Sequence, residues 1–389
     1  MKKIFFSLLG LFALCIFVAA LWVAHALSHL PDVTVLKHYR PPAAAEVVDR
    51  NGNFLTNYYD KKFRIWVPIS SLPDILIRAV VIAEDDTFFG HEGVNYQAVW
   101  DALRHDLKKK RFARGGSTIT QQMIKNVLLS KEKTITRKLR EFVLARKAEE
   151  ILSKKRILEI YLNEVEWGEN IYGVEAASRY YLDKNASELT AGEAALLAGM
   201  LPNPKYYNPF KRPDKTKHRQ EQVLFNMHQA KVMTDGEYEA ALEAPLALRK
   251  EESGRFDFAA LSNSNGRACY QKVLEQVLLS LYNEQDFYRK GLKIRTTLDK
   301  ALQSSFSAQT DSGSEQFHEP PDTVTVLKEG KEIRAISCTA NEEQARSFVN
   351  IPLNPVTSAF EVAYEVAAVA VDEIKKDEIV LPEQGMSAP

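Results

Sequence analysis

The sequence contains little cysteine, with only Cys15, Cys269 and Cys338 among its 389 residues. Small disulfide-stabilised scaffolds depend on several cysteine pairs, so this composition excludes that class. No spacing of Cys and His typical of zinc sites occurs, so a structural zinc ion is not expected. Cys269 and Cys338 could pair in an oxidising compartment, a question that the sequence leaves open.

Net charge is also absent, because 51 Lys and Arg balance 51 Asp and Glu. The balance is uneven along the chain: residues 101–160 hold 17 Lys and Arg against 7 Asp and Glu, and residues 357–389 hold 2 Lys against 7 acids. A basic middle segment indicates an anionic partner, which could be phosphate, lipid headgroups or nucleic acid. The length predicts two folded units, and a composition of 45% hydrophobic residues excludes disorder of the whole chain.

The chain has one long apolar run. Lys2 and Lys3 precede Ile4–Ala24, which contains no charged residue. As a helix rising ~1.5 Å per residue, the run spans a hydrocarbon core of ~30 Å, and the two lysines favour a cytoplasmic N-terminus. A signal peptide cleaved at Ala24-His25-Ala26 is the alternative, although the run exceeds the ~7–15 residues of a signal-peptide core. Either way the remainder lies outside the cytoplasm, which argues against a nucleic-acid partner.

Local patterns predict a mainly α chain. Residues 28–45, with three prolines, are expected to form an extended linker, and Val47–Tyr59 alternates around Asn51-Gly52 as a hairpin does. Apolar residues at helical spacing dominate residues 72–209. The other predicted elements are a helix opened by the capping box of Thr190 and Glu193, one or two helices in 216–247, strands at Gly291–Leu298, Thr323–Leu327 and Glu332–Ile336, a flexible loop at 308–322 and a helix at 358–376.

The first candidate site is the acidic cluster Glu84-Asp85-Asp86, which follows an apolar helical stretch. Adjacent acids repel one another and oppose the dipole at a helix C-terminus, so a solvated helix end is one interpretation. The other is a carboxylate held against an apolar wall, whose raised pKa suits a general base.

The second candidate site follows the Gly115-Gly116 bend, where Thr118 and Gln121 form a capping box. The cap alone explains these residues, but such a turn also presents backbone N–H groups to an anion. Lys125 lies one to two turns further on, within reach of a phosphate. The run Lys108–Arg111 is either a solvated loop or a segment beside anionic lipid headgroups.

In the third candidate site, Arg137 and Lys138 precede Glu141 by four and three residues and share a helical face with it. One interpretation is a surface ion pair, which contributes about 0.3–0.5 kcal/mol. The other is a cationic face for pyrophosphate with one embedded carboxylate.

Taken together and in this order, the clusters resemble the peptidoglycan glycosyltransferase family, which comprises monofunctional transglycosylases and the N-terminal domain of class A penicillin-binding proteins. The resemblance extends from about residue 45 to about residue 215. It implies a lysozyme-like helical transferase domain behind an N-terminal transmembrane helix, with a small mixed α/β C-terminal region. The matching motifs are Glu84-Asp85-x-x-Phe88-x-x-His91-x-Gly93, Gly115–Gln122 with Lys125-Asn126, Arg137-Lys138-x-x-Glu141, Ile157–Asn163 and Gly168–Ala177.

The resemblance also implies a reaction. Lipid II would be polymerised into glycan strands by inverting transfer, with release of undecaprenyl pyrophosphate. Glu84 and Glu141 are the implied catalytic residues, with Glu84 as the base and Glu141 beside the leaving group, where a divalent cation (Mg²⁺ or Mn²⁺) could bind through the pyrophosphate. No organic cofactor is implied. The implied substrate-binding residues are Asp85, Ser117, Thr118, Gln121, Gln122, Lys125, Asn126, Lys133, Arg137, Lys138 and Arg140. Lys133 replaces an arginine expected from the family, which keeps the charge but loses the bidentate fork.

The predicted organisation is a cytoplasmic tip and anchor (1–27), a linker (28–45), the transferase domain (46–215), a connector resembling that of class A proteins (216–299) and a short module (300–389). The Ser-x-x-Lys, Ser-x-Asn and Lys-Thr-Gly motifs of a transpeptidase do not occur after residue 300, and Ser130-x-x-Lys133 matches the first by letter only. We therefore expect no cross-linking activity, a separate transpeptidase as partner, and a single-pass protein of the bacterial inner membrane with its catalytic domain on the periplasmic side.

Two alternatives belong to other functional classes. A lysozyme-like site could cleave the same glycan, because glycosidases also use carboxylates. The shortened C-terminal region suggests a non-catalytic scaffold for wall synthesis. The basic residues favour a pyrophosphate-bearing lipid over the first alternative, and the paired acids in a cationic setting argue against the second.

Overall fold

The computed structural model describes residues 2–100, 116–130 and 132–249, then positions 271, 274–275, 278–279, 282–296 and 298–301, and three strands between 324 and 356. Two compact units share these residues, one made of Met1–Pro42 with Lys61–Ser253 and the other of Ala43–Asp60 with Gly254–Pro389. Four features predicted from the sequence lie outside the described residues: the Lys108–Arg111 run, the pair Cys269 and Cys338, the loop at 308–322 and the helix at 358–376.

The predicted apolar run is a single helix, α1 (Lys2–Leu27). Its segment Phe5–Leu27 is long and apolar enough to cross a membrane, and the large apolar side chains from Phe5 to Val23 are exposed. The linker beyond it is not extended throughout, because a short 3₁₀ helix, η1 (Thr34–Lys37), interrupts it. Arg156 fixes the linker by donating to the backbone carbonyls of Leu36 and Tyr39.

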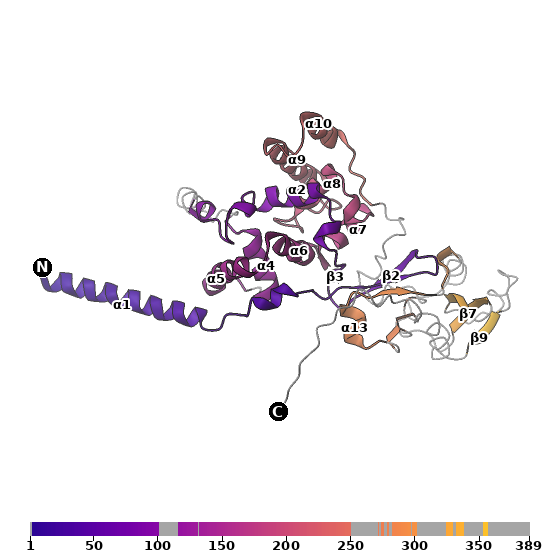
Figure 1. The fold of residues 1–389 in the computed structure, drawn as a ribbon, viewed down its shortest axis with the longest axis horizontal. Helices are drawn as coiled ribbons and strands as arrows, with labels where there is room; N and C mark the ends of the chain where they lie inside the picture. Colours follow the sequence, from indigo (N-terminus) through magenta and orange to yellow (C-terminus); the bar gives the residue numbers. More distant parts are fainter. Residues whose placement is uncertain are drawn as a thin grey trace, which may run out of the picture. The chain divides into compact units, whose positions relative to one another are not determined.

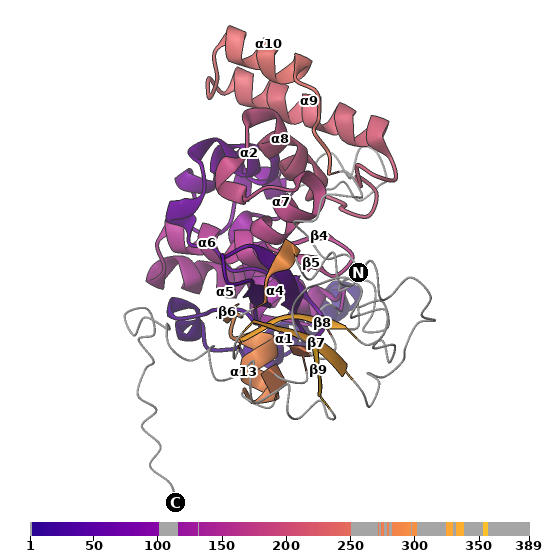
Figure 2. The same cartoon turned by 90° about the vertical axis from the view of Figure 1, so that its right-hand side faces the viewer.

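The first unit is a helical domain, as expected (Figure 1). Its helix α8 is apolar apart from Glu193 and nearly all of its side chains are buried, so it forms the centre of one half of the unit. It packs against α2, α7, α9 and α10, while α4 packs against α5 and α6 (Figure 2). The helices are α2 (Asp74–Glu84), α4 (Ile119–Leu128), α5 (Ile135–Ile151), α6 (Lys154–Glu164), α7 (Val174–Leu182), α8 (Ala191–Met200), α9 (Pro213–Gln229) and α10 (Asp235–Glu243), with 3₁₀ turns η2 (Ile69–Ser71), η3 (Phe88–Gly90) and η4 (Ala186–Glu188).

A small sheet completes the helical unit. Strand β3 (Phe63–Arg64) pairs in parallel with β5 (Ile171–Tyr172), which pairs antiparallel with β4 (Glu166–Gly168). The predicted capping box is present at the start of α8, where Thr190 and Glu193 each satisfy the other's backbone N–H. The segment predicted to hold one or two helices contains two, α9 and α10.

The second unit is a small α/β region. The predicted hairpin is present as β1 (Ala45–Val48) and β2 (Phe54–Tyr58), and Gly52 at its turn has φ +87°, a conformation that glycine adopts without strain. Strand β6 (Lys293–Arg295) pairs in parallel with β1, and Phe287 of α13 (Glu284–Arg289) packs beneath them against Tyr58. The two other predicted strands are present as β7 (Val324–Glu329) and β8 (Glu332–Ser337), joined by β9 (Leu353–Val356).

The compact units differ from the predicted organisation at both ends of the transferase region. The hairpin belongs to the second unit because β1 pairs with β6, more than 200 residues later. Helices α9 and α10, predicted to lie in the connector, belong to the helical unit because they pack against α8.

Candidate functional site

Glu84 is the last residue of α2 and lies mostly buried. Its Oε2 accepts a hydrogen bond of 2.7 Å from Nε2 of Gln122 on α4. Burial raises the pKa of the Glu84 carboxyl, and the nearby Asp85 adds to the rise, while the Gln122 hydrogen bond and the charges of Arg219 and Lys125 oppose it. The first acid of the cluster is therefore the desolvated carboxylate that a general base requires.

Asp85 has a different environment, because its carboxylate holds the start of α4. The Oδ2 atom accepts from the backbone N of Ile119 at 2.9 Å, and Nε2 of His91 lies 3.0 Å from Oδ1. The other ring nitrogen of His91 accepts from the backbone N of Gly93, so the ring proton resides on Nε2 and is donated to Asp85. Asp85 thus positions the helix that carries Gln122, and only Asp86 of the three acids is exposed.

The predicted cap of α4 is present and explains two of the predicted residues. Thr118 accepts from the backbone N of Gln121, whose side chain accepts in turn from the backbone N of Thr118. The Thr118 hydroxyl also donates to the carbonyl of Gly93 at 2.7 Å. Both side chains are 2% exposed, so their polar atoms are committed to the fold.

Glu141 on α5 is the second buried acid of the site, with 2% of its side chain exposed. Arg137 and Lys138 from the preceding turn each pair with one of its carboxylate oxygens, the latter at 2.8 Å. Lys138 also donates to the Ser117 hydroxyl at 2.7 Å and so ties α5 to the turn before α4. Burial, together with the charges of Arg137 and Lys125, lowers the pKa of Lys138 to about 8.

A cleft of about 210 Å³ lies beside the end of α2 and the turn before α4. Glu84, Asp85 and Ser117 are among the described residues that line it. Lys125 influences the pKa of both Glu84 and Lys138, so its charge lies within electrostatic range of the two ends of the site. The structure thus brings the three sequence clusters together.

Three of the predicted substrate-binding residues have other positions. Asn126 and Lys133 are exposed, the former on α4 and the latter in the segment before α5. Arg140 points to the apolar helix α1, where its Nε donates to the carbonyl of Ala26 at 2.7 Å. This contact satisfies a carbonyl near the C-terminus of α1, a position that favours a cation.

Glu141 does not have the environment of a metal ligand, because two cationic side chains already bind its two oxygens. No group of three His, Cys, Asp or Glu side chains converges anywhere in the described ranges. The residues present therefore do not fit a resident divalent cation, and the cation expected through the pyrophosphate stays a prediction.

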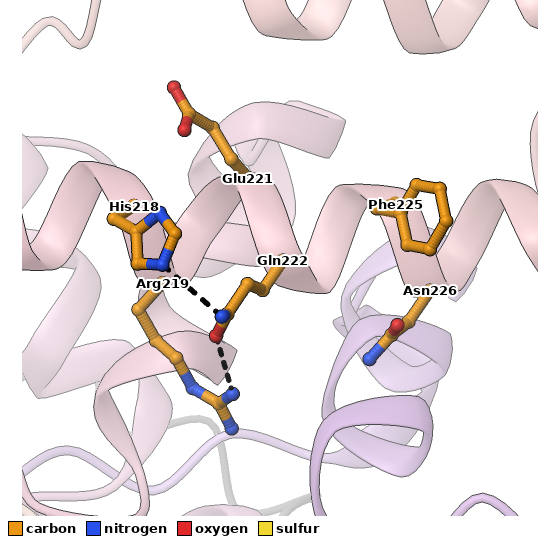
Figure 3. Close-up of a pocket in the computed structure, with 6 residues that line it drawn as sticks. All are labelled: His218, Arg219, Glu221, Gln222, Phe225 and Asn226. Atoms are coloured by element: carbon orange, nitrogen blue, oxygen red, sulfur yellow. Dashed lines mark hydrogen bonds between the residues drawn. The ribbon is translucent and has the colours of Figure 1, made fainter.

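Two residues near Glu84 were not among the predicted site residues. Arg219 on α9 lowers the pKa of Glu84 by its charge, and its guanidinium donates to the Gln222 side chain at 3.0 Å (Figure 3). Helix α9 forms the described wall of an open pocket of about 550 Å³ there. In the sequence, Arg219 is one of several basic residues at the start of a helix, so nothing in the sequence distinguishes it as a site residue. The second, Tyr161 on α6, lies in a matched motif, but its role depends on contacts that a motif does not give.

Most aromatic residues in and around the matched motifs belong to the core. Phe88, Tyr161, Trp167 and Tyr181 are fully buried, and Tyr172 is nearly so. Phe89 is the exception, with 64% of its surface exposed.

Comparison with known proteins identifies relatives of much of the chain. The model of a family described as Transglycosylase matches residues 51–228. Penicillin-binding protein 1A of Aquifex aeolicus is 35% identical over 314 residues, which are 80% of this chain and 42% of that protein. Penicillin-binding protein 1A of Rickettsia prowazekii is 32% identical over 327 residues, which are 82% of this chain and 40% of the relative. The chain therefore spans about two fifths of the length of the curated relatives it matches.

A solved structure, the 2.6 Å crystal structure of penicillin-binding protein 1A from Haemophilus influenzae, is 21% identical to the chain. The match covers 70% of this chain and 29% of the chain in that structure, with a TM-score of 0.37.

Proposed function

The chain belongs to the transglycosylase family through residues 51–228, and from this premise we propose that it polymerises lipid II into peptidoglycan glycan strands. The observation that carries the proposal is a cleft that a desolvated carboxylate lines, with a cation of α5 hydrogen-bonded to another residue of its lining. Glu84 lines the cleft, and Lys138, which pairs with Glu141 beside Arg137, donates to Ser117 of the same lining. The charge of Lys125 acts on the pKa of both Glu84 and Lys138. A base and a set of cations are what a displacement of pyrophosphate by a sugar hydroxyl requires.

In the proposed reaction Glu84 takes the proton of the acceptor sugar hydroxyl. The acceptor oxygen forms a bond to the anomeric carbon of the growing strand while the bond from that carbon to the pyrophosphate oxygen breaks. The bonding electrons leave with undecaprenyl pyrophosphate, and the anomeric configuration inverts. The raised pKa of Glu84 matches its task, since a carboxylate that holds a proton more tightly is a stronger base.

The cations would stabilise the charge that develops on the leaving group. Lys138, with a pKa of about 8, is mostly protonated at pH 7. Glu141 would not bind substrate directly, because its oxygens hold Arg137 and Lys138. It would instead keep both side chains in place until the pyrophosphate arrives, since preorganised charges cost no rearrangement during the reaction.

The substrate also fits the membrane helix. A polyprenyl lipid remains in the bilayer, so an enzyme acting on its headgroup gains from an anchor such as α1. We propose that α1 holds the helical unit on the periplasmic face of the inner membrane, and that a separate transpeptidase cross-links the strands.

The test is polymerisation of labelled lipid II by the detergent-solubilised chain, beside Glu84→Gln and the control Glu150→Gln, which changes an exposed acid on α5. We expect polymer from the parent and the control, and a loss of about 10²–10⁴-fold in Glu84→Gln, the usual contribution of a general base. Absence of polymer from the folded parent would refute the proposal and favour the scaffold. Release of soluble muropeptides from purified sacculi would favour a glycan-cleaving enzyme.

A further inference from the structure

The Glu84 carboxylate accepts a hydrogen bond from the amide of Gln122. A glutamine amide has two unlike ends, because its NH₂ group donates and its oxygen accepts. The Nε2 end stabilises ionised Glu84, whereas the Oε1 end would repel the carboxylate and favour its protonated form. The chemistry of Glu84 therefore depends on which end of Gln122 faces it.

The far end of the same amide contacts α6. The hydroxyl of Tyr161 lies 3.4 Å from Oε1 of Gln122, and the Tyr161 side chain is completely buried. Burial, with the nearby negative charges of Glu84 and Asp85, raises the pKa of Tyr161 well above its ordinary value. The phenol thus keeps its proton, and a buried hydroxyl needs an acceptor for it.

From this geometry we propose that Tyr161 is a positioning residue: its hydroxyl donates to Oε1 of Gln122 and thereby holds the Nε2 end of that amide toward the Glu84 carboxylate. The role of Glu84 as the base rests on the proposed function, but the orientation of Gln122 does not. The contact is long for an O–H···O hydrogen bond, so it contributes little binding energy of its own and adds to the preference of ionised Glu84 for the Nε2 end.

Other charges also face Glu84 and have to stay constant in a test. They are Asp85 at the end of α2, Lys125 on α4 and Arg219 on α9. Replacing Tyr161 by Phe changes none of them and removes one oxygen atom. Without the Tyr161 hydroxyl the amide is held only at its Nε2 end, so ionised Glu84 loses its donor for part of the time and the pKa of Glu84 rises.

The experiment follows the titration of Glu84 by infrared spectroscopy on chain labelled with ¹³C at its glutamate carboxyls, with Glu84→Gln as the difference reference. Tyr161→Phe, Gln122→Met and the double variant are compared with the parent. The control is Tyr181→Phe, which removes another buried hydroxyl, one that donates to the Trp167 carbonyl. We expect Tyr161→Phe and Gln122→Met each to move the Glu84 titration to higher pH, the double variant to match Gln122→Met, and Tyr181→Phe to leave it in place.

Kinetics supply a second readout. On the acid limb of the pH–rate profile we expect kcat of Tyr161→Phe to fall about fivefold with KM unchanged, and to recover at higher pH as Glu84 ionises. An unmoved Glu84 titration in Tyr161→Phe, or shifts that add in the double variant, would overturn the inference. If Tyr161→Phe does not fold, Gln122→Met alone has to move the Glu84 titration to higher pH. Its failure to do so overturns the inference as well. A shifted titration in a chain that makes no polymer would instead refute the proposed function and leave the inference standing.

Discussion

Glu84 and Glu141 are two buried glutamates of one site with opposite surroundings. Glu84 has a neutral amide at one oxygen, and burial raises its pKa. Glu141 is buried more completely, but a cation binds each of its oxygens. The comparison teaches that burial alone does not make a base, because the partners of a carboxylate decide whether it can take a proton.

The two surroundings also differ in what they contribute to the fold. The burial of Glu84 costs desolvation free energy, which the hydrogen bond from Gln122 offsets only in part. Such a cost is common where function and stability conflict. Glu141 offsets the charges of Arg137 and Lys138, so removing it leaves two cations without their counter-ion. The same substitution at the two positions should therefore have opposite effects on stability.

The largest expected effect on stability comes from Glu141→Gln. We expect its free energy of unfolding to fall by about 2–3 kcal/mol, somewhat less than for a fully buried pair because Lys138 keeps 48% of its side chain exposed. Glu84→Gln should leave the free energy of unfolding unchanged or raise it by up to about 1 kcal/mol. Urea unfolding at pH 7 measures both, and an equal loss in the two variants would break the comparison.

A second prediction concerns Lys125, whose charge lowers the pKa of both Glu84 and Lys138. Removing that charge in Lys125→Met raises both pKa values, so both limbs of the pH–rate profile should move to higher pH, with activity about tenfold or more lower. If only one limb moves, Lys125 serves only one end of the site. Lys147→Met, which removes an exposed lysine of α5, is the matched control.

A third prediction isolates Lys138. The parent should lose activity as the pH falls through the raised pKa of Glu84, because a protonated base cannot accept a proton. It should also lose activity above pH 8, where Lys138, with a pKa of about 8, gives up its charge. Lys138→Arg stays charged and should extend the alkaline limb upward, with kcat at pH 7 within about threefold of the parent. A limb that stays in place would assign it to another group.

Local parts of this arrangement could be predicted from the sequence. The cap of α4 involves Thr118 and Gln121, three residues apart, and the pairing of Glu141 involves residues one helical turn away. The hairpin around Asn51-Gly52 is equally local. Such elements depend on short-range geometry, which residue spacing determines.

The remaining features depend on contacts between distant parts of the chain. Residue spacing cannot show that Arg219 acts on Glu84, or that the Tyr161 hydroxyl meets Gln122, because both depend on how helices pack. The third candidate site illustrates the limit. Its spacing predicts correctly that Arg137 and Lys138 share a face with Glu141, but Arg140, in the same helical turn, contacts a residue 114 positions earlier.

The smallest effect is expected for Arg140, and it tests whether the cationic end of the site includes this residue. Because its Nε donates to the Ala26 carbonyl at the end of α1, Arg140→Ala should change kcat in detergent by about twofold or less, whereas Lys138→Ala should lower it by about tenfold or more. A loss in Arg140→Ala as large as that in Lys138→Ala would return Arg140 to the pyrophosphate site that the family motif implies. The smaller loss would assign the leaving-group charges of α5 to Arg137 and Lys138, and would leave Arg140 as the residue through which α5 holds α1.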